Sequence, residues 1–211
     1  MDTMKITRRF HSCVELAKNE TTLLIDPGSF EVPANLAEVD AVLVTHIHPD
    51  HVDAEALATA QKRSPGLKVY GPAELREHAD VDYTAVTDGD AFTVGDFDVS
   101  VHRWPHGAIT ESTPLPDNLG YLVDGRVLHT GDSFPDLEGV EVALVPVSAP
   151  WLKMLDVEAF LKTTKPTSFI GVHDGIDNDF GLALRKNLLT KLAEENGLNY
   201  LPLRPGDATE I

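Results

Sequence analysis

The sequence predicts an α/β sandwich, in which sheets are covered by helices, within one domain spanning residues 1–211. The chain has 211 residues, of which 42% are hydrophobic and 24% charged, an ordinary composition for a globular protein with a substantial core. Strand-like and helix-like segments alternate twice along it, and no Pro/Gly/Ser-rich linker separates two halves. This alternation is typical of layered folds that combine sheets and helices.

The first half of the chain predicts strands followed by helices. Residues 4–27 predict two strands joined by a turn at 18–21, and the apolar run 41–44 predicts a short strand buried on both faces. Asp53 is a good N-cap for a helix over 54–62. A loop with a short helical piece is expected over 29–40, a strand over 67–70 and a short helix over 72–78.

The second half repeats this order. Two strands over 87–104 are predicted to turn at 94–96, and a hairpin over 120–130 is predicted to turn at Asp124-Gly125. The apolar run 142–147 predicts another buried strand. Further predicted elements are a helix over 157–165, a strand over 168–172 and a long helix over 182–195. Residues 198–203 and 206–211 close the chain.

The chain is strongly acidic, with a formal net charge of −17. An acidic surface repels phosphate backbones, so neither nucleic acid nor an anionic membrane is expected as the main partner. A small-molecule substrate fits these properties better, and a homo-oligomer is compatible with them.

Cysteine content and hydropathy favour a cytoplasmic protein. Cys13 is the single cysteine, so an internal disulfide is excluded and the side chain is expected to act as a small buried hydrophobe. The N-terminus lacks the apolar region of a signal peptide, and no stretch approaches the roughly 20 apolar residues that span a bilayer.

Residues 45–51, Thr-His-Ile-His-Pro-Asp-His, form the most informative motif. Three imidazoles and a carboxylate fall directly after the predicted strand 41–44. Imidazole nitrogen and carboxylate oxygen are common ligands of Zn and similar divalent ions. The motif therefore predicts a metal site rather than a solvated polar loop.

Three more residues fit the same site, because each follows a predicted strand. These are His106, Asp132 and His173, and ends of strands are where α/β folds place ligand-binding side chains. The remaining histidines are not predicted to be ligands, since some lie in strand-like runs or at a helix end: His11, His78, His102 and His129.

These residues resemble the signature of the metallo-β-lactamase superfamily. The family motif, Ser/Thr before His-x-His-x-Asp-His, is matched by residues 45–51, and the later family residues match His106, Gly131-Asp132 and His173 in order. The family's upstream aspartate matches Asp26. The resemblance implies an αββα sandwich of two mixed sheets flanked by helices. Residues 10–14 and 24–28 further resemble the compact single-domain group that includes ascorbate-phosphate lactonase.

The resemblance also implies two divalent metal ions, with Zn expected and Mn or Fe as alternatives. Its ligand sets are His46, His48 and His106 for one ion, Asp50, His51 and His173 for the other, and Asp132 as a bridge. Asp50 and Asp132 are thereby expected to serve catalysis. Asp26 would lie behind the ligands and orient one of them by hydrogen bonding.

The expected activity is hydrolysis of a small ester, lactone, amide or phosphodiester by a hydroxide shared between the two ions. The short interval between Asp132 and His173 leaves no room for the inserted domain of the RNA-cleaving branch. Loops 29–40, 107–119 and 148–156 are predicted to form the pocket walls, with Trp104, Trp151 and Lys153 as candidate substrate contacts.

Two other functions stay open. Iron-dependent oxidoreductases, such as thiol or persulfide dioxygenases, share the implied fold, although di-iron relatives usually carry Glu where this chain has His48. A non-catalytic metal- or ligand-binding protein is the third candidate.

Overall fold

The computed structural model describes residues 2–211, and only Met1 of the predicted domain lies outside this range. It contains two seven-stranded sheets. The first sheet contains, in spatial order, β14 (Ala208–Glu210), β1 (Lys5–Arg8), β2 (Val14–Lys18), β3 (Thr21–Ile25), β4 (Ala41–Leu43), β5 (Lys68–Gly71) and β6 (Thr84–Ala85). The second contains β13 (Asn199–Tyr200), β12 (Ser168–Val172), β11 (Val142–Pro146), β10 (Val127–His129), β9 (Leu119–Val123), β8 (Phe97–Arg103) and β7 (Ala91–Val94).

Both sheets are mixed and follow the same plan. In the first, strands from β14 to β3 are antiparallel neighbours, whereas β3, β4, β5 and β6 run parallel. In the second, β7 to β10 are antiparallel, and β10 to β13 run parallel. The helices are α1 (Ala54–Arg63), the 3₁₀ helix η1 (Ala73–Glu77), α2 (Met154–Thr164) and α3 (Asp179–Asn196).

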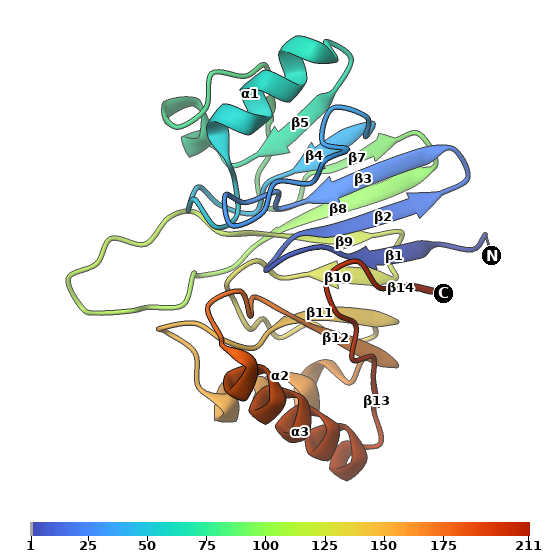
Figure 1. Cartoon of the computed structure of the whole chain (residues 1–211), viewed down its shortest axis with the longest axis vertical. Coiled ribbons are helices and arrows are strands. Elements are labelled where there is room, and N and C mark those ends of the chain that lie inside the picture. The colour runs from blue at the N-terminus through green and yellow to red at the C-terminus, as the bar shows by residue number, and fades with distance from the viewer. Residues whose placement is uncertain (1) are drawn as a thin grey trace.

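Three apolar layers stack these elements into the predicted αββα sandwich (Figure 1). Between the two sheets, side chains such as Leu16, Phe97 and Tyr121 are fully buried. A second layer joins the outer face of the first sheet to α1, and a third joins the second sheet to α2 and α3. Figure 1 shows α1 at one end of the long axis and α2 and α3 at the other.

The region 4–27 differs from its prediction, because it forms three strands rather than two. β1 ends at Arg8, which pairs with Val14 of β2, so residues 9–13 form a hairpin loop. Arg9 N donates to Cys13 O at 2.9 Å, and His11 has the left-handed φ of 56°. The predicted continuous strand is therefore wrong, because a polar turn interrupts it.

Smaller differences concern helix bounds. α3 begins at Asp179 because the Asn178 side chain caps it, accepting a hydrogen bond from Gly181 N. α2 begins at Met154, and residues 29–40 form turns without a helix. The predicted buried Cys13 is confirmed, with 1% of its surface exposed. Among the described residues, no helix is both long and apolar enough to cross a membrane.

Candidate metal centre

The predicted site residues converge at one edge of the sandwich, where strands of both sheets end. Asp26 follows β3, residues 45–51 come shortly after β4, and His106 comes soon after β8. Asp132 follows β10 and His173 directly follows β12. The two sheets thus bring together side chains that are far apart in the sequence.

The backbone at this edge is locally strained or tightly packed. Asp26 and His173 have left-handed φ angles of 52° and 63°, which cost a non-glycine residue of order 1–3 kcal/mol. Gly28 permits a close approach, because a Cβ built there would lie 1.9 Å from the backbone oxygen of Asp50. Such strain is typical of sites where geometry serves function.

One group of imidazoles consists of His46, His48 and His106, whose ring nitrogens lie within 4.8 Å of one another. His46 Nε2 is 3.1 Å from His48 Nδ1. His106 Nδ1 donates to the carbonyl of Gly107 at 2.7 Å, which leaves its Nε2 as a bare acceptor facing the group. Three converging imidazoles are a common set of ligands for Zn.

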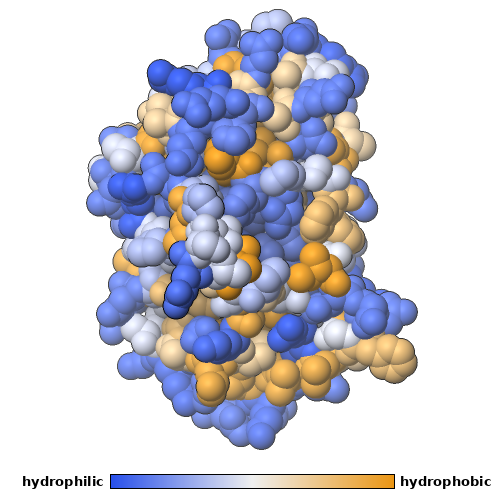
Figure 2. Space-filling model, turned by 90° about the vertical axis from the view of Figure 1, so that its left-hand side faces the viewer, coloured by the Kyte–Doolittle hydropathy of each residue, from blue (hydrophilic) through white to orange (hydrophobic). Residues whose placement is uncertain are grey.

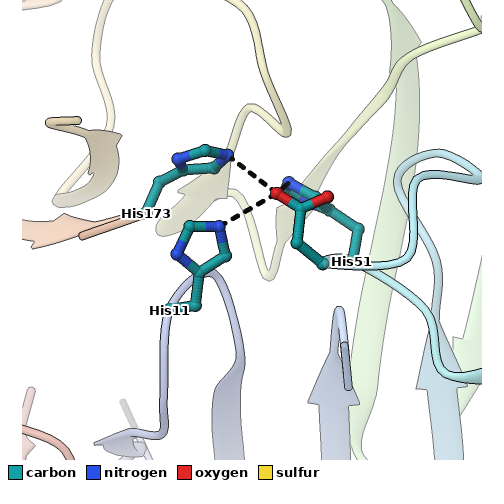
Figure 3. Close-up of side chains that lie close together, drawn as sticks. His11, His51 and His173 are labelled. Atoms are coloured by element: carbon teal, nitrogen blue, oxygen red, sulfur yellow. Dashed lines mark hydrogen bonds and ion pairs between the residues drawn. The ribbon is translucent and has the colours of Figure 1, made fainter. Parts of the chain in front are cut away.

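A second group contains Asp50, His51 and His173, joined by His11 (Figure 3). His51 Nδ1 donates to Asp26 Oδ2 at 2.7 Å, and His173 Nδ1 donates to Ser148 O at 2.6 Å. The Nε2 atom of each ring therefore faces the other members of the group. His173 Nε2 lies 3.5 Å from Asp50 Oδ2.

Asp132 lies between the two groups and is 2% exposed. Its Oδ1 is 3.2 Å from His51 Nε2, and its Oδ2 is 3.4 Å from His106 Nε2 and 3.1 Å from His173 Nε2. Trp151 Nε1 donates to Oδ2 at 3.1 Å. A single carboxylate thus reaches members of both groups.

Asp26 is fully buried and lies behind His51. It accepts hydrogen bonds from Thr45 N at 2.8 Å, from Thr45 Oγ1 at 2.6 Å and from His51 Nδ1 at 2.7 Å. These bonds fix the orientation and tautomer of the His51 ring, as outer groups around metal ligands commonly do.

Electrostatics make this buried site attractive to positive charge. Burial opposes ionisation of Asp132, yet His51 and His173 hold the pKa of its carboxyl well below the usual range. Burial lowers the pKa of His46 well below its usual value, so this ring stays neutral. Burial also disfavours charge on His51, but Asp132 and Asp26 outweigh it and raise the pKa of that ring well above its usual value. A cation at this site would replace the proton on His51.

Several buried ligand atoms of the site lack hydrogen-bond partners, as expected for residues that bind a divalent metal. His106 Nε2, His173 Nε2 and Asp132 Oδ1 are buried without a hydrogen-bond partner among the described residues. A buried polar atom left unpaired costs about 1–3 kcal/mol, so bound cations would satisfy three atoms that otherwise lower stability. Imidazole nitrogen and carboxylate oxygen suit Zn, Mn and Fe.

His11 belongs to the site although its sequence context was interpreted as strand. Its Nε2 lies 3.1 Å from Asp50 Oδ2, and Gly175 N donates to its Nδ1 at 2.9 Å. Two nearby polar residues, Arg9 and Ser12, are the signal of a turn in the sequence. His78 and His102 lie outside both groups, and His129 bonds the backbone of Ser12 and Gly131 instead.

A cavity of about 370 Å³ opens over the two groups. Each of the three predicted wall loops contributes to it, through Phe30, Ile109 and the pair Pro150 and Trp151. The segment after β12 adds Ile176, which the sequence did not indicate.

Of the three candidate substrate contacts, Trp151 alone lines this cavity. Trp104 stacks on His102, with ring centroids 5.1 Å apart, and packs into the layer beneath α2. Lys153 is exposed just before α2 and does not reach the cavity.

An αββα sandwich with histidine and aspartate side chains converging at one edge is the architecture of the metallo-β-lactamase fold. The family model described as a beta-lactamase superfamily domain matches residues 5–173. The chain therefore belongs to the beta-lactamase superfamily. The narrower resemblance to the ascorbate-phosphate lactonase group stays a prediction.

Similar proteins agree with this class. Protein Rv0786c of Mycobacterium tuberculosis is 30% identical over 180 residues, covering 82% of this chain and 85% of that protein. A UPF0173 metal-dependent hydrolase of Nanoarchaeum equitans is 27% identical over 187 residues, covering 81% and 83%. The metallo-beta-lactamase fold protein YhfI from Bacillus subtilis has a solved structure that matches with a TM-score of 0.76, at 19% identity and with 100% of both chains covered.

Proposed function

We propose that this protein is a binuclear hydrolase of a small ester, lactone, amide or phosphodiester. The observation that carries the proposal is the position of Asp132, whose two carboxylate oxygens face ring nitrogens from both histidine groups. One carboxylate in contact with both groups is the arrangement needed to bridge two ions.

The chain's own residues would hold the ions as follows. His46, His48 and His106 would bind one ion, Asp50, His51 and His173 the second, and Asp132 both. Two bound divalent ions would supply a shared hydroxide of near-neutral pKa and polarise the oxygen of the substrate. Hydrolysis adds a water oxygen to the substrate's carbon or phosphorus and breaks its bond to the leaving oxygen or nitrogen.

The cavity and the charge of the chain support a small substrate. A volume of about 370 Å³ lies within the range of ligand pockets for small molecules. The net charge of −17 opposes a polynucleotide, which would need a basic surface to follow its phosphates.

Metal analysis of purified protein tests the two-ion arrangement. We expect about two divalent ions per chain, falling to about one in both His106→Ala and His173→Ala, because each variant removes a ligand from one group only. Asp132→Ala should lower metal-dependent kcat at least 100-fold across a panel of lactones, esters and phosphodiesters, since it removes the shared ligand.

Two outcomes would contradict the proposal. Fewer than one ion per chain, with full metal-dependent activity in Asp132→Ala, would exclude the bridged arrangement. Oxygen uptake with a persulfide substrate, together with an iron chromophore, would favour the oxidoreductase alternative.

A further inference from the structure

Three large hydrophobic side chains are exposed around the mouth of the metal-site cavity. Phe30 is 47% exposed, Ile109 43% and Ile176 54%, and they come from three separate segments that line the same cavity. Figure 2, which views this edge of the molecule, shows hydrophobic residues bordering a hydrophilic hollow near the middle of the face. Apolar side chains grouped at a cavity mouth mark a site that binds another molecule.

The cavity lining holds two kinds of residue and no others. Five are predicted metal-site residues: His48, Asp50, His106, Asp132 and His173. The rest are apolar: Phe30, Pro49, Ile109, Pro150, Trp151 and Ile176. Within residues 2–211, none of the 17 Lys and Arg residues, and no hydroxyl or amide side chain, contributes to the lining.

This composition of the lining disfavours substrates that carry a second charged group. Recognition of a second phosphate or carboxylate group relies on Arg or Lys forks and on polar hydrogen-bond donors. Beyond the predicted ligands, the one polar hydrogen of a lining side chain belongs to Trp151 Nε1, which is donated to Asp132. The wall side chains outside the predicted ligands therefore offer a substrate mainly apolar contact.

The apolar side chains of the cavity also pack directly against residues of the metal site, which fixes their positions. The Phe30 ring packs on His11, with centroids 4.7 Å apart, and a Cβ on Gly175 would lie 3.0 Å from Phe30 Cδ2. The Trp151 ring covers Gly107, where a Cβ would lie 2.3 Å away. A pre-positioned wall loses little conformational entropy when it binds a substrate.

We propose that the substrate carries a neutral apolar acyl, alkyl or aryl group next to the bond that is hydrolysed, and that Phe30, Ile109 and Ile176 bind this group. The inference rests on the proposed hydrolase function and narrows it. Among the candidate substrates it favours apolar esters and lactones over phosphodiesters that bear further charges.

A series of p-nitrophenyl esters with acyl chains of two to eight carbons tests the inference on the metal-loaded enzyme. We expect kcat/KM to rise about two- to fourfold for each methylene until the cavity is filled. A matched pair isolates charge from length: the hexanoate ester should be preferred at least tenfold over the mono-ester of adipic acid, which ends in a carboxylate.

Binding without turnover gives an independent measurement. Alkyl hydroxamates have a metal-chelating head and an alkyl tail of variable length. Calorimetry on the metal-loaded protein therefore measures how much the contact between the tail and the apolar side chains adds to the affinity. We expect hexanohydroxamate to bind at least tenfold more tightly than acetohydroxamate. Ile109→Ser combined with Ile176→Ser should remove most of this difference, whereas Leu184→Ser, an exposed leucine of α3 outside the cavity, should leave it unchanged.

The outcomes separate this inference from the function on which it rests. Turnover or hydroxamate binding that is independent of chain length, or a preference for the carboxylate-ended ester, would refute the proposed recognition of an apolar group. Neither result would contradict the proposed hydrolase function. Absence of both turnover and hydroxamate binding would refute the hydrolase and the inference together.

Discussion

His11 Nε2 lies 3.1 Å from Asp50 Oδ2, and this contact joins the loop after β1 to the motif after β4. Gly175 N–H donates to the other ring nitrogen of His11, so the single proton of the neutral ring is on Nε2. The Nε2–H therefore donates to Asp50. A nitrogen that carries a proton has no lone pair for a metal, so His11 positions Asp50 rather than binding an ion itself.

Replacing His11 should weaken the half of the site that contains Asp50. In His11→Ala, we expect affinity for one of the two ions to fall about 10- to 100-fold, because groups that orient metal ligands typically have effects of this size. The other ion, facing His46, His48 and His106, should be retained. Competition with a chromophoric chelator measures both affinities without recourse to turnover.

Two variants make the role of His11 specific. His11→Gln keeps a nitrogen donor at a similar reach on a more flexible side chain and should recover part of the lost affinity. His78→Ala removes an exposed histidine at the end of η1 and should bind both ions as the wild type does. Equal loss of both ions in His11→Ala would indicate general unfolding of the site instead of repositioned Asp50.

Asp26 should matter for stability even without metal. Asp26→Ala leaves the buried Thr45 N–H and the His51 Nδ1–H without an acceptor. At about 1–3 kcal/mol for each unpaired group, we expect a loss of about 3 kcal/mol. For a chain of this size that corresponds to a fall in Tm of roughly 6–12 °C, measurable by calorimetry of the metal-free protein.

A matched aspartate provides the control for Asp26. Asp40 is exposed and accepts one hydrogen bond, from Thr22 N at 2.8 Å. Asp40→Ala should lower the free energy of unfolding by no more than about 1 kcal/mol, because water can replace the lost acceptor. Equal losses in the free energy of unfolding for the two substitutions would show that the buried hydrogen bonds of Asp26 stabilise the protein no more than an exposed one does.

The sequence was informative wherever a residue type and a strand end coincided. The apolar runs identified β4, β10 and β12, and their carboxyl ends located residues 45–51, Asp132 and His173. Strand pairing within the second sheet and packing of the two sheets against each other then bring these residues together. The layered fold could be predicted for the same reason, since each buried strand needs cover from a helix or a second sheet.

The remainder depended on backbone geometry that no periodicity encodes. His11 enters the site because a five-residue loop with a left-handed φ interrupts an apolar run. Ile176 reaches the cavity because His173 turns the chain with a φ of 63°. Conversely, Trp104 is a predicted substrate contact, but its side chain packs over Gly120 on the side of α2.

Trp151 should influence reactivity through one hydrogen bond. Its Nε1 donates to Asp132 Oδ2 at 3.1 Å, and Trp151→Phe removes this donor while keeping an aromatic wall. A hydrogen bond to a charged group contributes about 1.5–3 kcal/mol, so we expect kcat to fall about tenfold or more with both ions retained.

Phe134→Leu is the control for Trp151→Phe. It alters packing against the Trp151 ring but removes no polar atom, so it should change kcat less than twofold. An unaltered kcat in Trp151→Phe would show that the bond to Asp132 plays no part in the reaction.

His129 should make the metal-free protein less stable in acid. Its Nε2 donates to Ser12 O at 2.9 Å and its Nδ1 accepts from Gly131 N at 3.1 Å, so the ring is neutral and 1% exposed. Burial lowers the pKa of His129, and the nearby carboxylate of Asp26 only partly opposes this.

The unfolded chain takes up a proton near pH 6.5, whereas His129 in the folded chain accepts a proton only at a lower pH. The free energy of unfolding should therefore be largest above that pH and fall as the pH decreases below it. His129→Gln can replace both hydrogen bonds but cannot titrate, so its urea midpoint should fall less than that of the wild type between pH 7.5 and 5.5. Parallel decreases in the two proteins would assign the acid sensitivity to other groups.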